Sequence, residues 1–78
     1  MRDVITVSPV GEVWQVSAPS AEATLFKSGG RAESCARRLA QGLARHGRPV
    51  DVEIYLRDGG LAGRIRYLSA AAPALEPA

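Results

Sequence analysis

One segment of this 78-residue chain, residues 30–49, carries the only long helical pattern in the sequence. Its apolar residues are spaced three and four positions apart, so they lie along one stripe of a helix. They are Ala32, Cys35, Ala36, Leu39, Ala40 and Leu43. Gly47 and Pro49 end the pattern, because glycine terminates helices readily and proline cannot continue them. We therefore predict one helix over residues 31–46, about 24 Å long.

The two ends of the predicted helix carry capping and charge signals. Either Ser28 or Gly30 can serve as the N-cap, and the sequence leaves that choice open. Glu33 falls in the first turn, where the helix dipole favours a negative charge. Arg45 and His46 fall in the last turn, where the dipole favours a positive charge. We prefer this role for His46, the only histidine, to that of a general base.

The rest of the chain has the composition of short strands, with β-branched residues between turn residues. We predict strands at residues 3–8, 12–18 and 23–27 before the helix, and at 50–57 and 61–68 after it. The short connections favour an antiparallel meander for the first three strands. The expected fold is α+β in the order βββαββ, with one helix packed on one face of a mostly antiparallel sheet. The sequence does not determine the order of the strands in that sheet.

Alternating side chains give the last two strands two different faces. Turns are predicted at residues 9–11 and 58–60, and the second closes a hairpin because Asp-Gly tolerates positive φ. One predicted face is apolar and consists of Val50, Val52, Ile54, Leu56, Leu61, Ile65 and Tyr67. The opposite face is polar and consists of Asp51, Glu53, Tyr55, Arg57, Arg64 and Arg66.

Length and composition indicate one small domain, which we place at residues 1–68, followed by a flexible tail at 69–78 that two prolines interrupt. A chain of this size buries only about 60–65% of the surface that its unfolded form exposes, so its core is thin. No apolar run reaches the roughly 18–20 residues of a membrane span, and no signal peptide is visible. The single cysteine, Cys35, excludes an internal disulfide. We therefore expect a cytoplasmic protein without a membrane partner.

A set of residues in characteristic order and spacing runs through most of the predicted domain. They are Gly11, Trp14, Val16, Phe26, Ala32, Ala36, Leu39, Ala40, Val52, Ile54, Asp58, Gly59, Leu61 and Tyr67. Over residues 4–68 this pattern resembles the small bacterial family called domain of unknown function 2188. The pattern departs after Phe26, where the family usually has a Thr-Lys-x-Glu-Ala helix start and this chain has Ser-Gly-Gly-Arg-Ala. The resemblance implies a compact α+β domain and implies no activity.

The first candidate site is the segment before the helix, Ser28, Gly29 and Gly30. Backbone N–H groups at the start of a helix can receive a phosphate or a carboxylate. The complete glycine-rich phosphate-binding motifs are absent from the sequence. A strand-to-helix connection is therefore the preferred interpretation of this segment, and anion binding is the alternative.

The second candidate site is the polar sheet face, where Tyr55, Arg57, Arg64 and Arg66 are expected to meet across the final hairpin. Arginines beside an aromatic ring are typical of a sheet that binds nucleic acid. Acidic side chains share that face, however, and cross-strand Glu–Arg pairs are an ordinary solvated surface. The exposed side of the helix carries a further set of arginines, which either improve solubility or face phosphates. They are Arg31, Arg37, Arg38 and Arg45.

No catalytic or metal-binding set is visible in the sequence. Cys35 lies on the apolar stripe, where a free cysteine behaves as a small hydrophobe. One cysteine and one histidine cannot supply the roughly four ligands of a structural zinc site. We therefore expect neither an enzyme nor a cofactor. The preferred function is a homo-oligomeric interaction module, a dimer, because a thin core leaves one sheet face to be covered. The alternative is nucleic-acid binding through the sheet arginines or the helix ridge.

Overall fold

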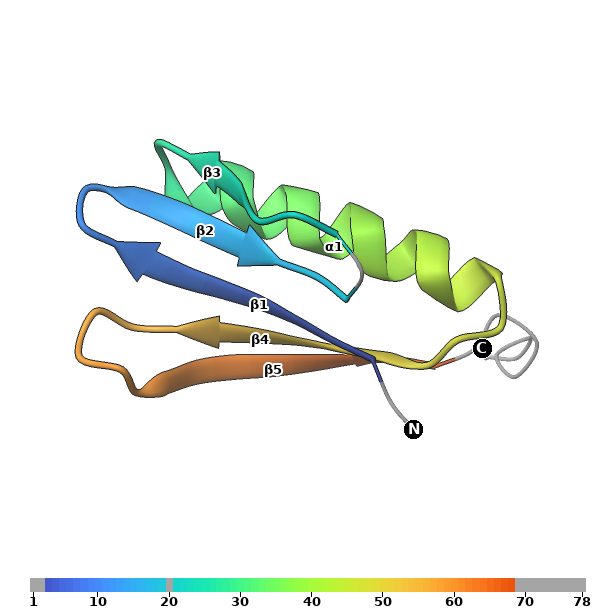
Figure 1. The fold of residues 1–78 in the computed structure, drawn as a ribbon. Helices are drawn as coiled ribbons and strands as arrows, with labels where there is room; N and C mark the ends of the chain where they lie inside the picture. The colour runs from blue at the N-terminus through green and yellow to red at the C-terminus, as the bar shows by residue number, and fades with distance from the viewer. Residues whose placement is uncertain (1–2, 20, 69–78) are drawn as a thin grey trace.

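A computed structural model of the chain shows, within the residues that it describes, one helix and a five-stranded mixed sheet (Figure 1). The structure describes residues 3–19 and 21–68. The elements are β1 (Asp3–Val10), β2 (Val13–Ser17), β3 (Thr24–Phe26), α1 (Gly29–Arg45), β4 (Val50–Tyr55) and β5 (Leu61–Tyr67). The predicted α+β class and the βββαββ order are therefore confirmed. The predicted tail at residues 69–78 lies outside the described residues.

The strands are arranged in the order β3-β2-β1-β4-β5. Pairing is antiparallel between β1 and β2, between β2 and β3, and between β4 and β5. The N-terminal meander and the C-terminal hairpin join through parallel pairing of β1 with β4. This parallel pair requires a crossover, and α1 supplies it. The sequence left the order open because a helical crossover does not specify which strand its end will join.

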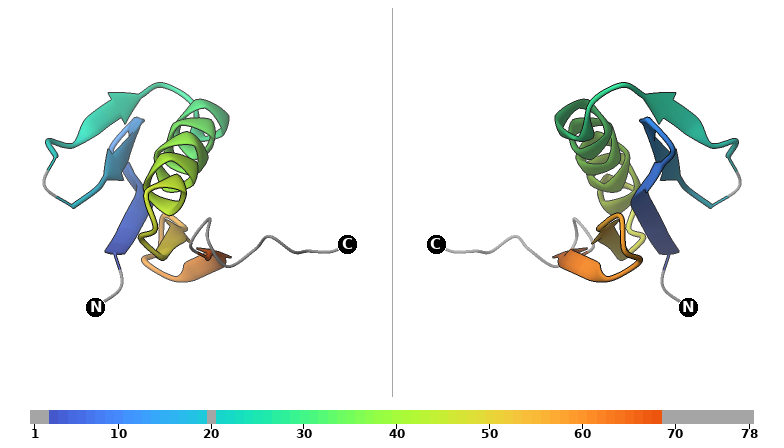
Figure 2. Two further views of the ribbon diagram at one scale, coloured as in Figure 1. Left: turned by 90° about the vertical axis from the view of Figure 1, so that its right-hand side faces the viewer. Right: turned by 90° about the vertical axis from the view of Figure 1, so that its left-hand side faces the viewer.

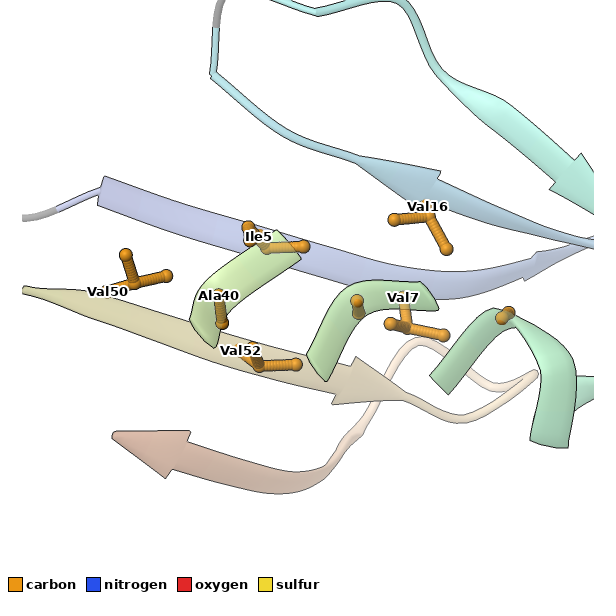
Figure 3. Packing of buried hydrophobic residues seen from close by; sticks show 8 residues of the cluster. Ile5, Val7, Val16, Ala40, Val50 and Val52 are labelled. Atoms are coloured by element: carbon orange, nitrogen blue, oxygen red, sulfur yellow. The ribbon is translucent and has the colours of Figure 1, made fainter. Parts of the chain in front are cut away.

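α1 covers one face of the sheet, as the end-on views in Figure 2 show, and the hydrophobic core lies between the two. Its sheet side is made of β-branched residues from the three central strands, and its helix side is made of alanines. The buried cluster is Ile5, Val7, Val16, Val50, Val52, Ala32, Ala36 and Ala40 (Figure 3). Because an alanine extends only one carbon from the backbone, α1 can lie close to the sheet and still fill the space between them.

The buried stripe of α1 differs from the predicted one at two positions. Ala44 is buried and extends the series of alanines at four-residue spacing. Leu39, which was predicted on the stripe, is instead 42% exposed. A series at this spacing turns by about 40° around the helix with each step. The surface of α1 that contacts the sheet rotates in the same way along the helix, and Leu39 lies outside it.

α1 begins at Gly29, before the predicted start at residue 31, and of the two N-caps left open by the sequence the structure has Ser28. The Oγ of Ser28 accepts a hydrogen bond from the Arg31 N–H at 3.1 Å. Because the helix starts at Gly29, Glu33 lies beyond the first turn, and its predicted place there was wrong. Glu33 instead pairs with Arg37 one turn later, at 3.0 Å.

The first predicted turn is displaced along the chain, and the second lies where it was predicted but begins earlier. Pro9 and Val10 belong to β1, and the first turn falls at Gly11, whose φ is 62°. β1 pairs with β4 only as far as Val7, so a proline beyond that point removes no hydrogen bond to β4. At the other turn, β4 ends before Leu56, which is exposed and was predicted on the apolar face.

A β-bulge near the start of β5 places Leu61 on the opposite face of the sheet from the one predicted. Gly63 pairs with Ile54, but Leu61 pairs with Tyr55, so one extra residue is accommodated between them. Directly opposed residues lie on the same face of a sheet. Leu61 therefore shares the face of Tyr55, and the prediction that it shares a face with Ile65 was wrong. A bulge of this kind has no signal in a simple alternation of polar and apolar residues.

Candidate functional site

The sheet face opposite α1 is not covered by any helix among the described residues (Figure 2). We call it the open face. The strand pairing places the following residues on it: Val4, Thr6, Ser8, Val10, Val13, Gln15, Ser17, Leu25, Asp51, Glu53, Tyr55, Leu61, Arg64 and Arg66. The open face is therefore mixed in character, with apolar, hydroxyl and charged side chains in different parts.

The half of the open face on β4 and β5 carries two ion pairs. Arg66 Nε lies 3.2 Å from Asp51 Oδ1, and Arg64 Nη2 lies 3.0 Å from Glu53 Oε2. Each pair joins residues directly opposite one another in the strand register. The arginine side chains are about half exposed, whereas the acidic side chains are mostly sheltered. The four formal charges sum to zero, so this half has balanced charge.

Tyr55 forms a hydrogen bond with one of these ion pairs, Glu53–Arg64. Its hydroxyl donates a hydrogen bond of 2.6 Å to Glu53 Oε1. This hydrogen bond raises the pKa of the Tyr55 phenol above its ordinary value of 10.0, since ionisation would break the bond and place two negative charges together. Tyr55, Glu53 and Arg64 thus form one connected network on the open face.

Of the four residues predicted to meet on this face, Arg57 is the exception. Its Nη1 donates a hydrogen bond of 2.7 Å to the carbonyl oxygen of Gly11, in the turn after β1. Arg57 follows the end of β4 and therefore joins two turns at one end of the sheet. The structure brings Tyr55, Arg64 and Arg66 onto one face and leaves Arg57 apart from them.

The other half of the open face, on β1, β2 and β3, has an apolar corner, which we define as Val10, Val13 and Leu25. Val10 pairs directly with Val13, and Leu25 pairs with Gln15, the next residue of β2 on that face. Leu25 is 59% exposed and Val10 is 49% exposed. Val10 was not predicted on this face, because Pro9 beside it suggested a turn.

At the start of α1, packing against Trp14 explains why one of the two glycines, Gly29, has no side chain. A Cβ atom built on Gly29 would lie 3.1 Å from Cε2 of the Trp14 ring, whereas one on Gly30 would meet nothing within 4 Å. Trp14 packs against the core from β2. Gly29 therefore lets the ring lie against the first turn of α1. This favours the predicted structural connection over the alternative of anion binding.

We expect Gly29→Ala to lower the free energy of unfolding by about 1–2 kcal/mol, since either the ring or the helix must move. The matched control is Gly30→Ala, which should leave stability unchanged or raise it by about 0.5–1 kcal/mol. Urea denaturation of both variants checks this. Equal stabilisation by the two alanines would show that the Trp14 ring does not require a glycine beneath it.

The exposed side of α1 carries an arginine ridge, which we define as Arg31, Arg38 and Arg45. All three side chains are exposed. Within the described part of the chain, none of them takes part in an ion pair. Arg37, the fourth predicted arginine of this surface, differs because Glu33 neutralises it.

A groove runs along the flank of α1 beside the arginine ridge, and we call it the flank groove. It consists of two adjoining hollows that share Arg38. The hollow near the helix start is lined by Phe26, Ser28, Gly30, Arg31, Ser34, Cys35 and Arg38. The hollow near the helix end is lined by Ala18, Pro19, Ala21, Arg38, Leu39, Gly42, Leu43 and His46. The second hollow is mainly apolar, and it separates α1 from the segment that follows β2.

Cys35 and His46, the two residues considered for catalysis from the sequence, both make contacts that stabilise the fold. Cys35 packs against the core and is partly buried. His46 is the C-cap of α1, and its Nδ1 lies 2.8 Å from the Gly42 carbonyl oxygen. Across residues 3–19 and 21–68, no group of three histidine, cysteine or acidic residues is placed to hold a metal ion. The same residues contain no helix that is long and apolar enough to cross a membrane.

No family model, curated protein or solved structure matches this chain. Membership of the family called domain of unknown function 2188 therefore stays a prediction from the spacing of residues such as Trp14 and Asp58.

Proposed function

We propose that this protein is a non-enzymatic interaction module that forms a homodimer through its open face. One observation carries the proposal: the only described helix covers one side of the sheet, and the other side presents an apolar corner beside balanced charges. We further propose that the module acts in the cytoplasm of a bacterium, as the resemblance and the single cysteine predict.

The charge pattern of the open face supports self-association. In a two-fold dimer the same surface meets itself, so it must be complementary to its own copy. Asp51 and Glu53 on β4 lie directly opposite Arg66 and Arg64 on β5, so a row of acids runs beside a row of bases. Rotation of a second copy can therefore bring acids against bases without net repulsion. The apolar corner adds the surface whose removal from water favours association.

The same pairs make nucleic-acid binding a weaker proposal for this face. Arg64 and Arg66 each have a carboxylate within 3.2 Å. A phosphate would have to displace that carboxylate or accept its repulsion, which removes much of the electrostatic gain that drives such binding. The balanced pairs therefore support a protein partner over a nucleic acid at this surface.

Sedimentation equilibrium over a range extending to high micromolar concentration tests the dimer. We expect a mass approaching twice that of the chain, and we expect Leu25→Lys to weaken self-association by at least about tenfold. Leu25 is exposed, so the variant should remain folded. The matched control is Leu39→Lys on the other side of the molecule, which should still dimerise. A single-chain mass for the unmodified protein throughout the range would overturn the proposal.

A further inference from the structure

The arginine ridge has a regular spacing along α1. Its members are seven residues apart, so successive arginines lie about 10.5 Å apart and the ridge spans about 21 Å. Seven residues are close to two full helical turns, so the three side chains lie nearly in line. No acid of the described chain neutralises Arg31, Arg38 or Arg45. The ridge therefore presents an uncompensated row of positive charge.

The flank groove runs parallel to this row and supplies an apolar surface. Leu39 and Leu43 line it from α1, and Ala18 and Pro19 line it from the other side. Gly42 lies between them, and a Cβ atom built there would meet nothing within 4 Å. The missing side chain leaves room for a partner to approach the helix backbone closely.

We propose that the flank groove binds an acidic amphipathic helix of a partner protein. The apolar face of that helix would fill the groove beside Leu39 and Gly42, as in helix-in-groove recognition. Acidic residues at seven-residue spacing on the partner would face the arginine ridge, in the way that flanking charges select partners in coiled coils. The repeat of a partner helix matches that of the ridge because both rise by the same distance per residue.

The apolar lining favours this occupant over a nucleic acid. A phosphate backbone would neutralise the arginines but would leave Leu39 and the other apolar groups of the groove in contact with water or with charge. An acidic amphipathic helix covers the apolar lining of the flank groove and neutralises the arginine ridge at the same time. The partner site is also separate from the open face, since α1 and that face lie on opposite sides of the sheet (Figure 2).

Fluorescence anisotropy with a labelled synthetic peptide tests the proposal. The probe is an acidic helix of three heptads, with leucine at the core positions and glutamate at the flanking positions. Mutual repulsion of the glutamates keeps the probe from pairing with itself. A second peptide carries lysine at the flanking positions, and a labelled single-stranded oligonucleotide is the third probe. We expect binding of the acidic peptide and at least about tenfold weaker binding of the basic one.

Charge variants test whether the arginine ridge contributes to binding of the acidic peptide. The triple change of Arg31, Arg38 and Arg45 to Gln should weaken binding of the acidic peptide at least about tenfold. Arg37→Gln is the control, because it removes one arginine charge from the same helix at a position where Glu33 already neutralises it. That control should change affinity less than about twofold.

A variant of the flank groove tests whether the apolar face of the peptide occupies it. Gly42→Leu fills the groove with a residue that favours helix, so the protein should stay folded and lose peptide binding. Circular dichroism confirms the fold of each variant. The Leu25→Lys variant of the open face should bind the peptide normally, which separates this proposal from the dimer. The proposal is overturned by failure of the acidic peptide to bind, by equal binding of the basic peptide, or by oligonucleotide binding that Gly42→Leu leaves unchanged.

Discussion

Shortening Val7 to alanine is expected to lower the free energy of unfolding by about 2–3 kcal/mol. Val7 is only 1% exposed, and it lies in the central strand, where it pairs with Val16 on one side and Ile54 on the other. The change removes buried methyl groups and leaves a cavity beneath α1. Such a loss corresponds to a decrease of about 10–20 °C in the midpoint of thermal unfolding.

The same strand offers a matched control for this prediction. Val10→Ala deletes the same atoms from β1 where the side chain is 49% exposed, so it should cost less than about 1 kcal/mol. Urea denaturation compares the two variants at a protein concentration where sedimentation shows single chains, because Val10 belongs to the apolar corner and its change would otherwise also act through self-association. Equal losses at the two positions would contradict the placement of Val7 in the core.

Enlarging Ala40 to leucine is expected to lower the free energy of unfolding by about 3 kcal/mol, through overpacking. Ala40 is fully buried between α1 and the sheet (Figure 3). Three additional carbon atoms at this position must push the helix away from β-branched residues that cannot change rotamer freely. The displacement would also loosen the contacts of the neighbouring alanines.

The control for this enlargement is the next residue of the helix. Gln41 is exposed, and leucine has a helix propensity similar to that of glutamine, so Gln41→Leu should change stability by less than about 0.5 kcal/mol. Thermal unfolding followed by circular dichroism measures both. If Ala40→Leu were neutral, the helix could not lie as close to the sheet as its alanines indicate.

The fold class was predictable because local signals agreed with one another. The alanine spacing defined the helix, and strict alternation between Val50 and Tyr55 defined the strongest strand. What local signals do not contain is long-range pairing. The parallel contact of β1 with β4 joins residues that lie far apart in the sequence. Neither this contact nor the bulge that turns Leu61 to the open face changes the local pattern of residue types.

The candidate surfaces were predictable to a similar degree. Alternation placed Tyr55, Arg64 and Arg66 on one face, but their ion-pair partners depended on the register of the hairpin. The hydrogen bond from Arg57 to Gly11 spans 46 positions of sequence and has no local signal. The flank groove was not predicted, because it forms only where α1 lies beside the segment that follows β2.

The central place of β1 has a consequence for the order of folding. During synthesis the first strand emerges early, but its partner β4 is made only after α1. Until then the meander has β1 as a free edge, with backbone hydrogen-bonding groups unpaired along Asp3–Val7, the stretch that later joins β4. Completing the sheet must close a loop of more than forty residues, which slows folding relative to a chain with local pairing only. We expect the incomplete chain to be the form of this protein that is most prone to aggregate.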